Sequence, residues 1–73
     1  MFDNSMERKN LLSEIARFKI IVKKDYKHNL ITKNQYELMH FELDSIIENL
    51  VNSDLLILTI KFHTIKSIYL IML

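Results

Sequence analysis

Apolar residues in the first third of the chain mostly recur three or four positions apart, which is the spacing of one face of an α-helix. Asn4 and Glu7 have the spacing of a capping box, so this helix is predicted to begin near Asn4. The stripe stops at His28 and Asn29, and Asn is the non-glycine residue best suited to the left-handed conformation that ends a helix. The predicted apolar stripe consists of Leu11, Leu12, Ile15, Phe18, Val22 and Tyr26.

A second apolar stripe follows after a short link. Thr32 and Gln35 form another capping box, and Ile31 and Tyr36 stand at the positions of a hydrophobic staple around it. Because this start signal lies so close to the stop signal at Asn29, the two helices are predicted to lie side by side as an antiparallel hairpin. Each stripe alone would otherwise face water. The second stripe consists of Tyr36, Met39, Leu43, Ile46, Ile47 and Leu50.

The remaining segment, Leu55–Leu73, is apolar and is separated from the second helix by Asn52-Ser53-Asp54, which is predicted to end that helix. Lys61, His63 and Lys66 near its middle argue against an ordinary membrane span. Helical spacing favours a third helix over a strand, either covering the hairpin or pairing with another chain. Lying on a membrane surface would need a stronger polar face than the segment has. Its predicted stripe consists of Leu58, Phe62, Ile65, Tyr69 and Met72.

Composition supports an all-α fold. The chain has no Gly and no Pro, which favours long helices with short links and excludes glycine-rich phosphate loops. Without Cys, neither a disulfide nor a thiolate metal site is possible, and no two of the three histidines have the spacing of a helical metal pair. We expect a hairpin over residues 1–54 and an apolar extension over 55–73. Since 73 residues bury a modest core, homodimerisation or docking on a partner is expected to add stability.

The distribution of charged residues bears on which partners the protein binds and on where in the cell it acts. A net charge of +1 argues against a protein whose main partner is nucleic acid. The first predicted helix is basic and the second is acidic, so exposed pairs between them would each contribute a few tenths of a kcal/mol, roughly, and would help to select the antiparallel register. No short basic segment followed by an apolar stretch opens the chain, and together with the absence of Cys this predicts a cytoplasmic protein.

The middle of the second predicted helix reads His40-Phe41-Glu42-Leu43-Asp44. This run resembles the Ser-Gln-Glu-Leu-Asp motif of the stage-zero sporulation protein E family, which are small helical-hairpin phosphatases. The last three residues match the motif, whereas the first two replace the family's Ser and Gln. The surrounding hairpin follows the family pattern without a gap, over a little more than half of the chain.

The resemblance implies a phosphatase that removes the aspartyl phosphate of the sporulation response regulator and so acts as a negative regulator of sporulation. Asp44 would be the catalytic residue, inserted at the phosphorylation site, and His40, Phe41, Glu42 and Leu43 would contact the partner. The chain would need no cofactor of its own, because a divalent metal, Mg, is carried by the regulator. A carboxylate or an amide on a helix can place water in line with phosphorus, which is most of what an activated acyl phosphate requires.

The residues themselves leave alternatives open. His40 lies one turn before Asp44 and either hydrogen-bonds its carboxylate or is simply solvated. Phe41 cannot orient water, so it would impair turnover, and it either anchors a partner or packs against the C-terminal segment. A non-catalytic helical interaction module is therefore the second candidate function. A small DNA-binding protein is the third, suggested by the basic first helix and disfavoured by the acidic second one.

Overall fold

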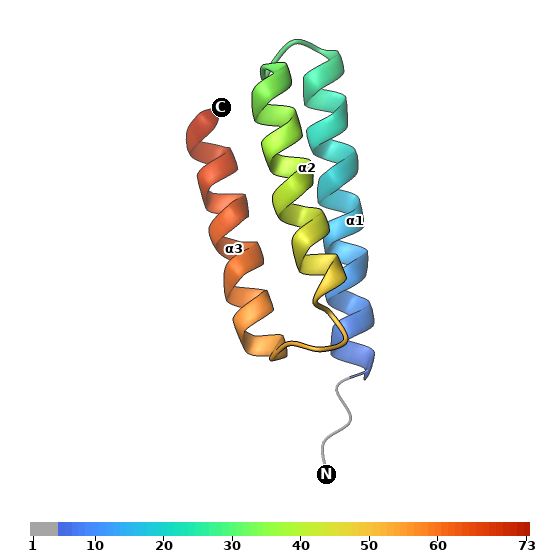
Figure 1. Ribbon diagram of the computed structural model, residues 1–73. Helices are drawn as coiled ribbons and strands as arrows, with labels where there is room; N and C mark the ends of the chain where they lie inside the picture. Colours follow the sequence, from blue (N-terminus) through green and yellow to red (C-terminus); the bar gives the residue numbers. More distant parts are fainter. Residues whose placement is uncertain (1–4) are drawn as a thin grey trace.

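The protein, described here over residues 5–73 by a computed structural model, consists of three helices and, within those residues, no strand. They are α1 (Ser5–Lys27), α2 (Lys33–Glu48) and α3 (Leu55–Met72), so the predicted all-α class is confirmed. Successive helices run in opposite directions and lie side by side, and the C-terminus ends near the turn between α1 and α2 (Figure 1). The predicted helix start at Asn4 lies outside the described residues.

The turn between α1 and α2 has the backbone that its residues predict. Asn29 adopts a left-handed conformation, with φ of 61°, and its N–H donates to Tyr26 O at 3.1 Å. The N–H of Leu30 donates to Asp25 O at 2.9 Å, which completes a Schellman motif. Together these bonds satisfy two carbonyl groups that the end of α1 would leave without a partner.

The second capping box is confirmed. The hydroxyl of Thr32 accepts a hydrogen bond from Gln35 N at 3.1 Å, and Gln35 Oε1 accepts one from Thr32 N at 2.8 Å. Both partners lie within four residues of each other, so this start signal acts locally and can be identified from the sequence.

The predicted end of α2 is wrong by several residues. The helix stops at Glu48 with Asn49 as its C-cap, ahead of the predicted break at Asn52-Ser53-Asp54. At this end the N–H groups of Asn49 and Leu50 donate three residues back, to Ile46 O and Ile47 O, and the side-chain amide of Asn49 donates to Ser45 O at 2.7 Å. In the link that follows, the guanidinium of Arg8 in α1 donates to the carbonyls of Leu50 and Ser53. Asp54 instead caps the next helix, since its carboxylate accepts from Leu56 N at 2.8 Å.

One hydrophobic core runs through all three helices. Leu12 does not belong to it, contrary to the predicted stripe, because it is rotated away from its buried neighbour Leu11 and is 41 % exposed. Four predicted stripe residues, Tyr26, Tyr36, Ile47 and Met72, pack at the margin of the core and are only partly buried. The buried core consists of Leu11, Ile15, Phe18, Val22, Ile31, Met39, Leu43, Ile46, Leu50, Leu58, Phe62, Ile65 and Tyr69.

Helix α3 is fixed to the hairpin through aromatic side chains. The ring of Phe18 in α1 meets those of Phe62 and Tyr69 in α3 edge to face, with centroids 5.9 and 5.3 Å apart. The phenol of Tyr69 also donates a hydrogen bond to the carboxylate of Asp25. Burial, and then this contact with Asp25, raises the pKa of Tyr69, so the phenol keeps its proton at physiological pH.

Replacing Phe62 tests whether α3 completes the core. Phe62→Ala should lower the free energy of unfolding by about 3–5 kcal/mol, since it removes a ring that is 1 % exposed. Ile60→Ala on the same helix is the matched control and should cost less than about 1 kcal/mol, because Ile60 is 58 % exposed. Urea unfolding monitored by circular dichroism measures both, and Phe62→Leu provides a milder variant if Phe62→Ala does not fold. Equal, small effects would show that α3 does not pack as described.

Candidate functional site

The five residues of the motif point in different directions around α2. Successive residues of an α-helix are rotated by about 100°, so neighbours in the sequence cannot share one face. Leu43 has no exposed surface, and the prediction that it contacts a partner is therefore wrong; it holds α2 in the core. Phe41 is 70 % exposed, and the side chain of Asp44 is half exposed. His40 and Glu42 are partly buried, on opposite sides of the helix.

Asp44 is held by a lysine from the neighbouring helix. Lys19 Nζ of α1 lies 2.5 Å from Asp44 Oδ1, and the side chain of Lys19 is only 27 % exposed. The other ion pair identified within residues 5–73, Lys33 with Glu37 at 4.0 Å, lies inside α2. The expected attraction between a basic and an acidic helix is thus concentrated at Asp44, whose carboxylate keeps one side open to solvent.

His40 is partly buried, and no hydrogen bond joins it to Asp44 among the described residues. Its Nε2 is buried without a hydrogen-bond partner among the described residues. Its ring lies 4.4 Å from that of Tyr36, which itself stacks on Tyr26 at 4.5 Å. Burial is the main cause that lowers the pKa of His40, and the nearby charge of Lys19 lowers it further, against a smaller opposing effect of Asp44. The imidazole is therefore neutral at pH 7.

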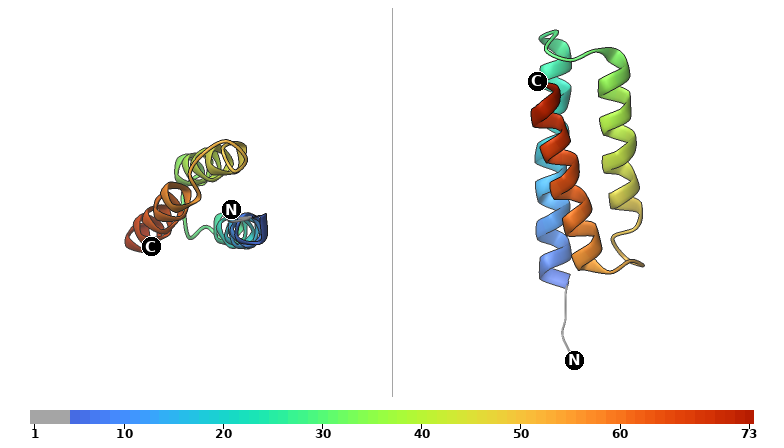
Figure 2. Two further views of the ribbon diagram at one scale, coloured as in Figure 1. Left: turned by 90° about the horizontal axis from the view of Figure 1, so that it is seen from below. Right: turned by 90° about the vertical axis from the view of Figure 1, so that its left-hand side faces the viewer.

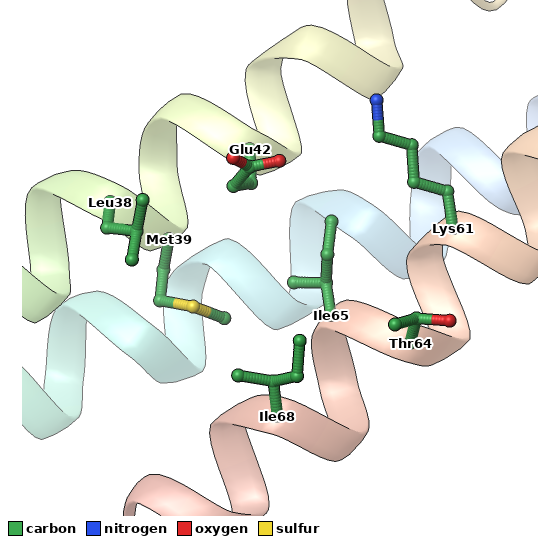
Figure 3. A pocket seen from close by; sticks show the side chains of 7 residues that line it. All are labelled: Leu38, Met39, Glu42, Lys61, Thr64, Ile65 and Ile68. Atoms are coloured by element: carbon green, nitrogen blue, oxygen red, sulfur yellow. The ribbon is translucent and has the colours of Figure 1, made fainter.

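Glu42 faces a different part of the molecule from Asp44. It lines a groove of about 320 Å³ between α2 and α3, together with Lys61. Met39 of α2 and Ile65 and Ile68 of α3 point toward one another across this groove (Figure 3). Asp44 instead faces α1, so the structure brings together Lys19, His40 and Asp44 and leaves Glu42 out of that group.

Sequence analysis missed the specific partner of Asp44. In an antiparallel hairpin, residues at comparable distances from the turn meet, and by that rule Lys19 was one of several lysines that could have faced Asp44. The stacking of Tyr26 of α1 on Tyr36 of α2 follows the same rule and was also missed, and the His40 ring, one turn along α2, lies tilted against that of Tyr36. No group of three His, Asp or Glu side chains suited to holding a metal ion occurs within residues 5–73.

The lowered pKa of His40 predicts a pH dependence of stability. The unfolded chain binds this proton more readily than the folded one, so stability is highest above about pH 6.5 and falls as the pH drops through the lowered pKa. His40→Gln should flatten this fall. Urea midpoints of both proteins between about pH 7.5 and pH 5 provide the measurement, and the difference between the curves isolates the histidine because the carboxylates are shared. Parallel curves would contradict the prediction.

Comparisons with known proteins complete the description of the site. No protein-family model, no curated protein and no solved structure matches this chain. A function for Lys19, His40, Phe41 and Asp44 therefore rests on their own chemistry and, for the last three, on the resemblance of the motif that contains them.

Proposed function

We propose that this protein is a phosphatase that hydrolyses the aspartyl phosphate of a response regulator, with Asp44 as the residue that enters the regulator's phosphorylation site. The accessible carboxylate of Asp44 on the surface of a rigid helix is the observation that carries this proposal. Its side chain is 50 % exposed, while the preceding residue, Leu43, is fixed in the core. A catalytic group on such an element is held more precisely than one on a loop.

The proposed reaction is a hydrolysis. Water attacks phosphorus, the bond between phosphorus and the oxygen of the regulator's aspartyl group breaks, and inorganic phosphate and a free carboxylate leave. Asp44 orients the attacking water through its carboxylate. A divalent metal ion, Mg, carried by the regulator stabilises the charge of the phosphoryl group, so this chain supplies no cofactor.

In this proposal Lys19 reduces the repulsion between the carboxylate of Asp44 and the phosphoryl group. A carboxylate that approaches a phosphoryl group is repelled, and in a dry interface that repulsion is much larger than in water. The ammonium group 2.5 Å from Asp44 offsets one negative charge at the place where the two groups meet.

Exposed Phe41 is suited to contact the regulator beside Asp44. Aromatic side chains that are exposed in the free protein are frequent anchors in interfaces. His40 lies one turn before Asp44 on the same side of α2, where it is partly buried against Tyr36. Glu42 would meet the regulator only at the edge of the contact. In this proposal the protein acts in the cytoplasm, where it lowers the level of the phosphorylated sporulation regulator.

A non-catalytic interaction module is the second candidate, and Phe41 is the observation that favours it. A phenyl ring stands where the related motif has Gln, and it offers no group that hydrogen-bonds water. Such a protein would bind the regulator through Phe41 without shortening the life of its phosphate.

Replacing Asp44 tests the phosphatase proposal. Asp44→Ala should slow the loss of a radiolabelled phosphoryl group from purified sporulation response regulator by about 100-fold or more relative to wild type, as expected for a residue that positions the attacking water. Glu37→Ala, which removes another exposed acid of α2, should retain activity. Circular dichroism establishes that both variants fold. Full activity in folded Asp44→Ala would overturn the proposal.

Replacing Phe41 with Gln, the residue of the related motif, distinguishes the two candidate functions. Phe41→Gln should increase the rate of phosphate loss by roughly 10-fold, because the amide can hold water beside Asp44. The exposed position makes the substitution compatible with folding. A tight complex whose phosphate lifetime is unchanged both in wild type and in Phe41→Gln would instead identify a binding module.

A further inference from the structure

Helix α3 is apolar on two faces, of which the hairpin covers only one. By length and composition the helix could cross a membrane, yet only 22 % of the residues in this span are buried. Six large apolar side chains of α3 are exposed, each between 49 and 83 %, five of them on its outer side and Ile68 at the edge of that side, beside the groove toward α2. The right-hand view of Figure 2 looks at this side of the bundle, where α3 lies in front of α1 and α2 stands beside it. The six are Leu56, Ile57, Ile60, Ile68, Leu70 and Ile71.

The hydroxyl groups of α3 do not need water. Thr59, Thr64 and Ser67 donate to the carbonyls of Leu55, Ile60 and His63, one turn earlier, at 2.8, 2.9 and 3.0 Å. These bonds satisfy the side-chain donors inside the helix. The outer face can therefore leave water without stranding a hydroxyl donor, and the exposed imidazole of His63, on the same stripe as Leu56 and Leu70, is the polar group that has to stay at the polar boundary of a lipid layer.

The charges of α3 lie at the edges of this face and are positive. The helix contains no acidic residue. Lys61 borders the groove toward α2, and Lys66 lies on the side toward α1, where its ammonium is 5.1 Å from the centre of the Phe62 ring. Within residues 5–73, neither lysine forms an ion pair with a carboxylate. Long lysine side chains in such positions extend their charge to a polar boundary while their stems stay on apolar surface.

We propose that the outer face of α3 lies on the surface of a lipid bilayer that contains anionic phospholipids, with Lys61 and Lys66 contacting headgroup phosphates. A bilayer surface offers both an apolar layer and negative charge, and this combination matches the face and its edges. A second copy of α3 matches less well, because it would bring four lysines together without an acid on either helix. Asp44 faces α1 on the other side of α2, so the attachment leaves it accessible.

The test is flotation of the full chain with lipid vesicles. We expect it to float with vesicles of phosphatidylcholine and phosphatidylglycerol, to bind pure phosphatidylcholine much more weakly, and to be released by high salt. Lys61→Gln combined with Lys66→Gln should weaken binding about 30-fold. Ile60→Asp combined with Ile71→Asp should abolish it, whereas the same change at Ile20 and Ile21, exposed residues of α1, should not.

Three outcomes would overturn the proposal. Wild-type protein that stays unbound would exclude a lipid surface. A dimer in sedimentation velocity that is lost only in the Ile60→Asp and Ile71→Asp protein, without flotation, would identify a second copy as the occupant. Protein that resists both high salt and alkaline extraction would be spanning the bilayer. Helix content by circular dichroism establishes that every variant is folded.

Discussion

The contact of Phe18 with Phe62 and Tyr69 is the interaction on which the rest of the structure depends. A hairpin of α1 and α2 alone has one apolar stripe per helix and leaves the open side of both stripes in water. The two edge-to-face contacts, at 5.9 and 5.3 Å, close that side with α3. In a chain of 73 residues without disulfides, a third helix is the main way to add buried apolar surface. The hydrogen bond from the phenol of Tyr69 to the carboxylate of Asp25 then fixes the position of α3 along the axis of α1.

The rotation of about 100° per residue divides the motif among different surroundings. Leu43 is fixed in the core, and one step further Asp44 reaches the surface beside α1, where Lys19 holds it. His40, one turn earlier, is partly buried against the ring of Tyr36, and burial lowers its pKa, so its imidazole is neutral at pH 7. In the proposed reaction the chemistry therefore rests on Asp44, while its neighbours set the position and the charge around it.

Local signals were predicted well and distant contacts poorly, for a physical reason. The left-handed Asn29 and the capping box of Thr32 and Gln35 depend on bonds within a few residues, so the pattern alone identifies them. The link after α2 is held by Arg8, which is 42 residues from Leu50 in the chain, so no local pattern identifies this contact. The exposure of Asp44 follows from the helical period, but its pairing with Lys19 depends on how the two helices are aligned. The burial of His40 requires that same alignment.

Amphipathic character can belong to a bundle rather than to a single helix. Judged alone, α3 has too weak a polar face to lie on a membrane, which is why its sequence argues against that role. In the folded protein the hairpin supplies the polar side, because α1 and α2 carry most of the charged residues and cover one face of α3. The other face remains mainly apolar around His63, bordered by Lys61 and Lys66, and its hydroxyls are bonded within the helix. The same packing that completes the core thus exposes an apolar surface, and a large apolar surface on a small bundle calls for an environment that covers it.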